Sequence, residues 1–348
     1  MLIGNQASHV VSSVVTPVAL EGHKIPALNQ FGGAAAAYSL RRLKSWGDGA
    51  RVVDVRRSTD DAERSFTAAA VADGTLVDWV GSGDGYVSTW YDQSGNGNHA
   101  VQNTAARQPK IVDGGVMVAD GLKFDGAQAL YTNDYAVSLS QNSASVFAVT
   151  NATTPRYLLT EADEAEYSSN FIFGAAESIA APALLWVNGD TFGSPYPTSS
   201  AVTGFIFDGT NFQAYANGAE DGASGTATVH PEANGRTSIG SEARINNPAF
   251  FYEGTIAEII CYKSDQSANR RAIESNMSIA HDIDIVDGYD PGNDLVDGFV
   301  TTWYDQSGYG NHATQSALEI TLPEQLRKSS CNICARVWAS SSVLAIKR

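Results

Sequence analysis

Cysteine is almost absent from this chain. Its 348 residues include three, Cys261, Cys331 and Cys334. An odd and sparse count excludes a fold held together by a framework of disulfides. The Cys331–Cys334 pair forms a single CxxC, and the sequence around it lacks the further ligands that a zinc site requires. We therefore expect no structural zinc at this pair.

Positive charge is also scarce. The chain has 22 Lys and Arg against 38 Asp and Glu, which gives a formal net charge of −16. A field of this sign repels nucleic acids and anionic lipids, so we expect neither a nucleic acid nor a membrane as partner. No apolar run approaches the roughly 20 residues of a membrane span. The first 15 residues carry no Lys or Arg, unlike a secretory signal peptide. We therefore expect a cytosolic protein, or one that reaches a virion or extracellular setting by another route, such as assembly into a virus particle.

Short strands between turn-forming residues dominate the middle of the chain. Glycine occurs 32 times, and only 17% of residues are charged. This composition favours many short strands joined by glycine turns. Apolar and β-branched segments at regular spacing predict strands at Arg51–Arg56, Tyr86–Tyr91, Gly121–Phe124, Ala129–Thr132, Ser145–Thr150, Asn170–Phe173, Leu184–Val187, Gly204–Asp208, Phe212–Ala216, Thr226–Val229, Thr237–Ile239 and Gly254–Lys263.

Helical signals are few. Residues 265–277 place Ala268, Ala272 and Ile273 near one face and begin with residues that can cap a helix. A short helix is also expected near Leu76–Val80, and the alanine-rich residues 34–47 predict a short helix or the start of a strand. The whole pattern predicts an all-β jelly-roll sandwich of two antiparallel sheets, with one short helix near the end of the domain.

A segment of the chain is repeated. Residues 84–102 and 297–315 are identical at 15 of 19 positions, with an offset of 213. Chance does not produce such a match, so the segment was duplicated. We divide the chain into residues 1–33, an arm or linker; residues 34–285, the sandwich; and residues 286–348, the truncated start of a second repeat with an atypical tail. The arm is either a disordered terminus or an attachment segment to a partner.

The repeated segment contains a loop of turn-forming and oxygen-bearing residues. Positions 1, 3, 5 and 7 of this loop are Asp92, Ser94, Asn96 and Asn98. The spacing imitates the start of a calcium-binding loop, which makes Asp92, Asn96 and Asn98 candidate calcium ligands. The alternative is a rigid turn in which Asp92 accepts hydrogen bonds from backbone N–H groups and Trp90 packs in the core. Both alternatives stay open from the sequence alone.

Several motifs carry a family resemblance. The segment WYDQSGNGNHA (Trp90–Ala100) resembles the catalytic domain of the fungal arabinofuranosidase B family, as do AYSLRRL (Ala37–Leu43) and the stretch Phe251–Met277. The segment Gly121–Leu130 resembles a strand common to concanavalin A-like (laminin G-like) domains. The resemblance covers about 250 residues and implies a concanavalin A-like sandwich. The combination of motifs looks most like modules of bacteriophage tail and virion proteins.

The resemblance also implies where catalytic acids would lie. A retaining glycosidase needs two carboxyl groups about 5–5.5 Å apart. The family's nucleophilic glutamate lies in a segment whose nearest counterpart here is Leu184–Phe192, where Asp190 is the only acid. The partner acid would correspond to Asp265, which is equally suited to cap a helix. The family's vicinal cysteine pair is missing.

Aromatic and polar residues of the same region suit sugar binding. Rings contact the apolar faces of pyranoses, and amides and carboxylates pair with hydroxyl groups. The candidates are Trp186, Asn188, Asp190 and Tyr196, although Trp186 could equally be a core residue. The leading expectation is a carbohydrate-binding or structural module of a phage virion or tail, with a glycan or polysaccharide and other virion proteins as partners. The alternative is an α-L-arabinofuranosidase that acts on arabinose-containing polysaccharide.

Overall fold

The computed structural model divides the chain into two units. One is Ile25–Tyr289, and the other combines Met1–Lys24 with Asp290–Arg348. The described residues are 26–45, 49–137, 143–154, 156–163, 169–174, 184–229, 235–242, 249–286, 302–303 and 313–314. Cys331 and Cys334 lie outside them, so the expectation for that pair stays a prediction. In the described part, no helix is long and apolar enough to cross a membrane.

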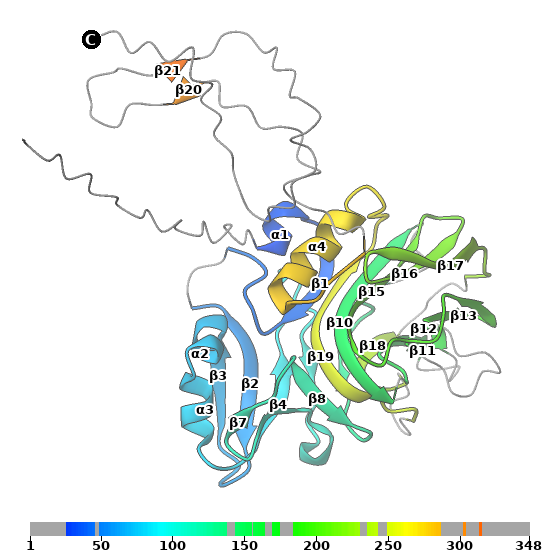
Figure 1. Cartoon of the computed structure of the whole chain (residues 1–348). Helices are drawn as coiled ribbons and strands as arrows, with labels where there is room; N and C mark the ends of the chain where they lie inside the picture. Colours follow the sequence, from blue (N-terminus) through cyan, green and yellow to red (C-terminus); the bar gives the residue numbers. More distant parts are fainter. Residues whose placement is uncertain are drawn as a thin grey trace, which may run out of the picture. The chain divides into compact units, whose positions relative to one another are not determined.

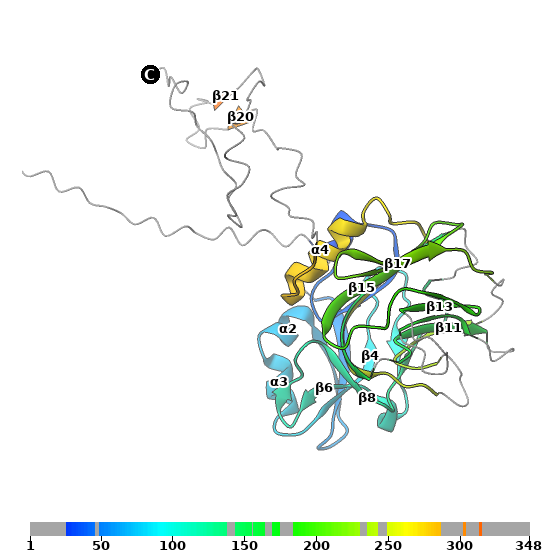
Figure 2. The same cartoon turned by 45° about the vertical axis from the view of Figure 1, so that its right-hand side comes forward.

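The first unit is an antiparallel β-sandwich (Figures 1 and 2). Its first layer pairs five strands in the order β17, β16, β15, β10 and β19, and two more strands pair with the far edge of β19. The strands of this layer are β1 (Ala34–Ser39), β8 (Leu122–Asp125), β10 (Ala144–Thr154), β15 (Ser200–Phe207), β16 (Phe212–Ala216), β17 (Ala219–Gly225) and β19 (Glu253–Tyr262).

The second layer pairs strands in the order β3, β2, β4, β5, β9, β18, β11, β12, β13 and β14. Their bounds are β2 (Arg51–Arg57), β3 (Glu63–Thr67), β4 (Gly85–Trp90), β5 (Ala100–Val101), β9 (Leu130–Tyr131), β11 (Leu159–Asp163), β12 (Ser169–Phe173), β13 (Leu185–Val187), β14 (Asp190–Phe192) and β18 (Gly235–Ile239). Strand β6 (Lys110–Asp113), extended by β7 (Val116–Met117), joins β4 to β8 and so connects the two layers.

The core fills the space between the layers. Phe205 of the first layer packs against Phe171 and Phe173 of the second, at ring distances of 5.6 and 5.5 Å. The other face of the first layer is covered by α1 (Ala27–Gln30) and α4 (Arg270–His281), whose Leu28 and Ile273 belong to a second apolar cluster. The predicted all-β sandwich is therefore confirmed. Residues 27 and 28, assigned above to an arm, pack against the sandwich.

Most predicted elements are present, with one strand to correct. The alanine-rich residues 34–39 form strand β1, the strand alternative of the prediction, because pairing with β19 outweighs the helical preference of alanine. The strand predicted at Thr226–Val229 is wrong: β17 lies just before it and ends at Gly225. The expected helices are α4, which begins later than predicted, and α3 (Thr75–Val80), which follows α2 (Ala68–Ala72).

In the second unit, the described residues form one hairpin. Strand β20 (Thr302–Trp303) pairs with β21 (Ala313–Thr314), with Trp303 opposite Ala313. In the first copy of the repeat Trp90 lies opposite Ala100. The two registers are identical once the offset of 213 is subtracted, so the duplicated sequence specifies the same strand pairing twice.

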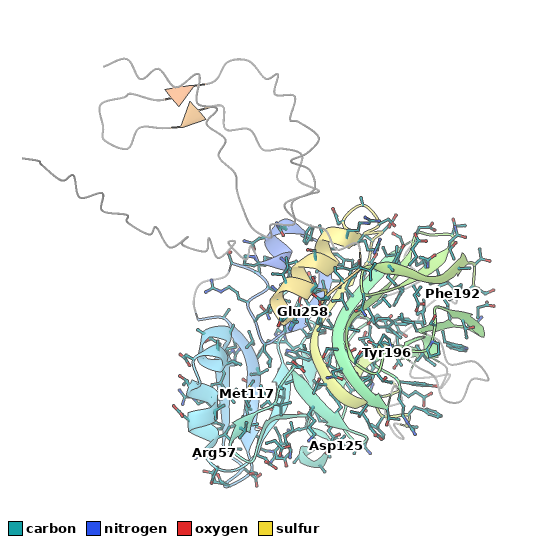
Figure 3. All side chains as sticks on the ribbon, in the orientation of Figure 1. Arg57, Met117, Asp125, Phe192, Tyr196 and Glu258 are labelled. Carbon is teal, nitrogen blue, oxygen red and sulfur yellow. The ribbon has the colours of Figure 1, made fainter. Side chains whose placement is uncertain are left out.

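A buried carboxylate fixes β1 and α4 to the sheet. Glu258 of β19 is fully buried (Figure 3) and accepts hydrogen bonds from Arg41 at 2.7 and 2.8 Å and from the hydroxyl of Ser39 at 3.0 Å. The ring nitrogen Nε2 of His281 at the end of α4 lies 3.0 Å from the same carboxylate. Burial raises the pKa of Glu258, but the charge of Arg41 and the hydrogen bonds from His281 and Arg41 lower it further, to about 2.

This carboxylate predicts a loss of stability in acid. Its folded-state pKa lies below the ordinary value, so its stabilisation is complete above about pH 4.5 and is lost as the pH falls toward 2. We expect the unfolding free energy, measured in urea, to lose about 2 kcal/mol from this group between pH 5 and pH 3. Glu258→Gln should be about 3 kcal/mol less stable at pH 7 and should show a weaker decline in acid. Glu253→Gln, on the same strand, serves as control, and an equal acid decline in Glu258→Gln and wild type would contradict the assignment.

Candidate functional site

One row of side chains crosses the outward surface of the second layer. Directly paired residues of antiparallel strands project from the same side of a sheet. The pairings connect, in order from β14 to β2, Thr191, Trp186, Ile172, Thr160, Ser238, Tyr131, Val101, Thr89 and Asp54. Their sequence neighbours, such as Phe171 and Val187, are fully buried in the core. We call the surface that carries this row the outer face.

Aromatic side chains gather at the β13 end of the outer face. Trp186 and Phe250 are half-buried and pack against the buried Tyr157 and Ile172. The rings of Tyr157 and Phe250 are stacked, 4.9 Å apart with an angle of 25° between their planes. A bridge between Tyr157 and Phe251 holds the two segments together. The result is an apolar platform of two partly exposed rings on a sheet surface.

The backbone at Phe250 is strained. Its φ of 54° lies in the left-handed region, which a bulky aromatic residue rarely adopts. Such a conformation costs about 1–3 kcal/mol and is often found at functional sites. Here it places the ring of Phe250 against Tyr157 rather than elsewhere in the loop. The strain therefore accompanies formation of the aromatic platform.

Hydroxyl groups occupy the middle of the outer face. The hydroxyl of Thr160 donates to the carbonyl of Ser241 at 3.0 Å, and the hydroxyls of Ser238 and Ser241 lie 3.0 Å apart. Tyr131 is half-buried, and its hydroxyl lies 3.4 Å from that of Ser241. The guanidinium carbon of Arg236 lies 3.8 Å from the centre of the Tyr131 ring. Thr160, Ser238 and Ser241 are fully buried, so the half-buried Tyr131 and Arg236 are the groups that continue the surface beyond the aromatic platform.

The structure separates the four predicted sugar-binding residues. Trp186 lies on the outer face, and Asn188 is exposed in the tight turn between β13 and β14. Asp190 pairs with Val187, so it belongs to the opposite face of the hairpin from Trp186. Tyr196 is a core residue: it is 3% exposed, and its hydroxyl lies 2.8 Å from those of Thr150 and Thr203 (Figure 3). The prediction that Trp186 and Tyr196 lie on one face is therefore wrong.

The two candidate catalytic acids lie in different layers. Asp190 belongs to strand β14 of the second layer. Asp265 follows β19 of the first layer and accepts hydrogen bonds from the backbone N–H and the hydroxyl of Ser267, at 2.8 and 2.6 Å. These contacts form a turn before the helix, and the predicted capping role is wrong because α4 begins at Arg270 with Asn269 as its N-cap residue. The two acids form no common site.

Two further acids belong to the strands beside the outer face. Glu161 of β11 faces the core, where it accepts hydrogen bonds from Val137 and Thr237 at 2.6 and 2.7 Å. Glu242 directly follows Ser241 and is 4% exposed. The sequence analysis did not select Glu242. Its position just after a predicted strand and before the family-like stretch at Phe251 was the signal that could have found it.

The loop that starts at Asp92 is held by hydrogen bonds. One oxygen of Asp92 accepts from the backbone N–H groups of Ala37 and Ser94, and the other from the Ser94 hydroxyl and the Asn98 N–H. The side-chain amides of Asn96 and Asn98 donate to the carbonyl of Ala35 at 3.0 and 2.8 Å. These are the contacts of the rigid turn. Among the described residues no group of three or more His, Cys, Asp or Glu is placed to hold a metal ion, and calcium at this loop stays a prediction.

Comparisons with known proteins give structural likenesses only. No family model matches the sequence, and no curated protein matches it. A solved arabinofuranosidase in complex with arabinofuranosyl-α-1,2-xylobiose is 17% identical over 71% of this chain and 63% of that one, with a TM-score of 0.52. A GH54 α-L-arabinofuranosidase soaked with a cyclic sulfate inhibitor is 14% identical over 80% and 69%, with a TM-score of 0.49. A Trypanosoma rangeli sialidase is 14% identical over 56% and 31%, with a TM-score of 0.37.

The chain spans about two thirds or less of the solved chains that it resembles. At these identities the likeness concerns the fold and not the chemistry. The first unit is thus an all-β sandwich similar in fold to a solved arabinofuranosidase.

Proposed function

We propose that the chain is a carbohydrate-binding β-sandwich whose outer face holds a sugar ring against Trp186. The observation that carries this proposal is the partly exposed indole of Trp186, which packs on the same buried cluster as Phe250 and shares its row with the half-buried Tyr131. The likeness to an arabinofuranosidase supports the same sandwich fold, and carbohydrate binding rests on the face itself.

The composition of the outer face matches the two sides of a sugar. The C–H groups of a pyranose or furanose form an apolar surface that packs on an aromatic ring. Its hydroxyls lose water on binding and need hydrogen-bonding partners, because an unpaired buried polar group costs about 1–3 kcal/mol. Trp186 supplies the ring, while Tyr131 and Arg236 supply partly exposed polar groups farther along the face. A flat sheet surface can accept several sugar units in succession.

Removal of the indole should abolish most of this binding. We expect Trp186→Ala to weaken binding of arabinofuranosyl-α-1,2-xylobiose by about tenfold or more, because stacking and burial of apolar area are lost. Titration calorimetry would measure the affinity. Trp79→Ala is a matched control, since Trp79 is also half-buried but lies on α3, where Arg57 packs over its ring at 4.8 Å. Equal affinities of wild type and Trp186→Ala would contradict the proposal.

Hydrolysis of arabinose-containing polysaccharide is the second candidate function. Glu242, buried and next to the hydroxyl cluster, is the observation in its favour. A retaining mechanism needs a second carboxyl group about 5–5.5 Å away. Asp190 lies on β14, four strands from the β18 that precedes Glu242, and Asp265 follows β19 of the other layer, so neither supplies it. Binding without hydrolysis is therefore the better-supported function.

An assay for released sugar separates the two functions. We expect no arabinose from arabinofuranosyl-α-1,2-xylobiose incubated with the purified chain, as judged by chromatography. Release of arabinose that Glu242→Gln eliminates would establish the hydrolase instead. Release of arabinose that Asp190→Asn eliminates would instead establish Asp190, the acid expected from the family resemblance, as catalytic.

We further propose a virion or extracellular setting with other virion proteins as partners. Support comes from the resemblance of the motifs in Ala37–Leu43 and Trp90–Ala100 to modules of phage tail and virion proteins, and from the acidic composition of the chain. Mass spectrometry of purified particles from the source of the gene should detect this chain. Its absence from particles, with abundant protein in the cytosol, would contradict the setting.

A further inference from the structure

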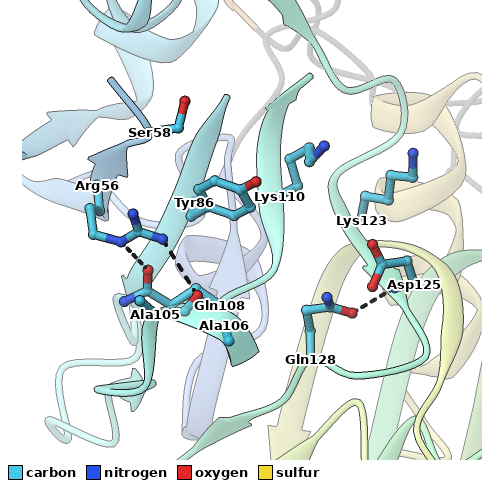
Figure 4. Close-up of a pocket in the computed structure, with 10 residues that line it drawn as sticks. All are labelled: Arg56, Ser58, Tyr86, Ala105, Ala106, Gln108, Lys110, Lys123, Asp125 and Gln128. Atoms are coloured by element: carbon cyan, nitrogen blue, oxygen red, sulfur yellow. Dashed lines mark hydrogen bonds between the residues drawn. The ribbon is translucent and has the colours of Figure 1, made fainter. Parts of the chain in front are cut away.

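A cleft of about 400 Å³ opens beside the ends of β2, β4, β6 and β8 (Figure 4). Its volume is in the range typical of small-ligand sites. Three cationic side chains line it, those of Arg56, Lys110 and Lys123, together with the ring of Tyr86. The one acid in its lining is Asp125. The lining itself thus carries three cations and one acid, and Arg56 also forms an ion pair with Asp61 at 2.6 Å.

Strand register brings the cations together. Arg56 pairs with Tyr86, Tyr86 with Lys110, and Lys110 with Lys123, which forms one row across four strands. Lys110 and Lys123 are directly opposite each other on an antiparallel pair, and their ammonium groups point the same way in Figure 4. Like charges in this position destabilise a sheet. Here the carboxylate of Asp113, which lies 2.9 and 3.1 Å from the two ammonium groups, offsets this repulsion.

Two aspartates hold the lysines without lining the cleft. The ammonium of Lys110 lies 2.9 Å from Asp113 and 3.1 Å from Asp84, and that of Lys123 lies 3.1 Å from Asp113. The hydrogen bond that Lys110 donates to Asp113 is the largest influence on the pKa of Lys110 and raises it, so this lysine is charged at neutral pH. In the described part of the chain, Asp113 is the one ionic partner of Lys123, which leaves two of its three N–H donors for a ligand.

The remaining lining supplies fixed polar groups. Tyr86 lies between Arg56 and Lys110, with the guanidinium carbon 4.9 Å and the ammonium 5.8 Å from its ring centre. The side-chain amide oxygen of Gln128 accepts a hydrogen bond from the backbone N–H of Asp125 at 2.7 Å. The NH₂ group of the same amide remains as a donor. The hydroxyl of Ser58 accepts the N–H of Asp84 and can still donate its own hydrogen. Neutral donors thus accompany the cations, as recognition of a hydroxyl-rich anion requires.

The cleft opens on the same side of β2 as the outer face. Arg56 lies two residues from Asp54, the last residue of the row that leads to Trp186. Both are half-buried, whereas Val53 and Val55 between and beside them are fully buried in the core. Alternation along the strand therefore directs Arg56 and Asp54 to one side. The segment that contains the short helix η1 (Ala105–Arg107) separates the cleft from the outer face.

We propose that this cleft binds the carboxylate of an acidic sugar, a hexuronate, between Lys110 and Lys123. The choice of a sugar rests on the carbohydrate-binding function proposed above, whereas the choice of an anion rests on the cleft alone. The ammonium groups pair with the carboxylate, and the amide of Gln128 and the hydroxyl of Ser58 pair with ring hydroxyls. The neutral face at Trp186 and the cationic cleft would then select a polysaccharide with both neutral and acidic units.

The test compares one acid with its uncharged form. Titration calorimetry at low ionic strength would use trigalacturonate and its methyl ester, which keeps the shape and removes the charge. We expect wild type to bind the acid about tenfold or more tightly than the ester, and added salt to reduce this difference. The double variant Lys110→Gln with Lys123→Gln should bind the acid as weakly as wild type binds the ester. Lys263→Gln with Arg271→Gln, two exposed cations elsewhere, makes the same change in net charge and should leave the preference intact.

The outcomes distinguish this inference from the proposed function. Equal binding of acid and ester, or an unchanged preference in the lysine double variant, overturns the cleft proposal. If wild type does not bind trigalacturonate but binds arabinofuranosyl-α-1,2-xylobiose through Trp186, the cleft proposal fails and the outer-face proposal is supported. If it binds trigalacturonate through the lysines while Trp186→Ala binds the neutral trisaccharide as well as wild type does, the outer-face proposal fails and the cleft stands. Thermal unfolding of each variant confirms that it is folded.

Discussion

The register of antiparallel strands is the constraint on which the rest of this structure depends. Successive side chains of a strand alternate between faces, so a shift of one residue would exchange core and surface. The pairings of the second layer align the row from Thr191 to Asp54 on the outer face, and on the other side of the same strands Phe171, Val187 and their neighbours fill the core. The β2–β4 register shifts between Asp54 and Val55, and beyond this shift the pairings of β2, β4, β6 and β8 present four side chains to the cleft. The core and both proposed binding surfaces thus depend on strand pairing.

Two buried carboxylates hold β1 in place through hydrogen bonds, in addition to its strand pairing. Asp92 connects its loop to β1 through the N–H of Ala37, 55 residues earlier in the chain. Glu258 connects β19 to Ser39 and Arg41 at the other end of β1 and to His281 of α4. Each accepts several hydrogen bonds, which offset the cost of burying its charge. The carboxylate of Asp92 thus holds its loop against β1, and the second copy of the motif reproduces the same strand register at Trp303.

The fold shared with a solved arabinofuranosidase does not by itself assign chemistry to this chain. In the β13–β14 hairpin, Val187 and Asp190 lie opposite each other on the face away from Trp186. Glu242 is the acid next to the hydroxyl cluster, and the candidate acids Asp190 and Asp265 lie elsewhere. The proposed sugar binding rests on the partly exposed rings of Trp186 and Phe250.

The sequence by itself determined the class of fold and most of its elements. Alternating apolar residues, β-branched residues and glycine turns act within a few residues, so they are visible without the fold; the strands around Val146 and Ile259 and the helix around Ile273 follow from them. The turn contacts of Asp92 also depend on residues nearby in the chain.

Tertiary structure alone decided which of these residues meet. The sequence predicted the same surface position for Trp186 and Tyr196. Pairing with Ile172 places Trp186 on the outer face, whereas Tyr196 lies in the core, where its hydroxyl contacts those of Thr150 on β10 and Thr203 on β15. Lys110 and Lys123 are 13 positions apart, and only the pairing of β6 with β8 places them opposite each other. The alanine-rich segment 34–39 forms strand β1 because it pairs with β19, which is distant in sequence. Pairing between strands distant in sequence leaves no periodic signal in either strand, which is why the sequence could predict the strands but not the sites they build.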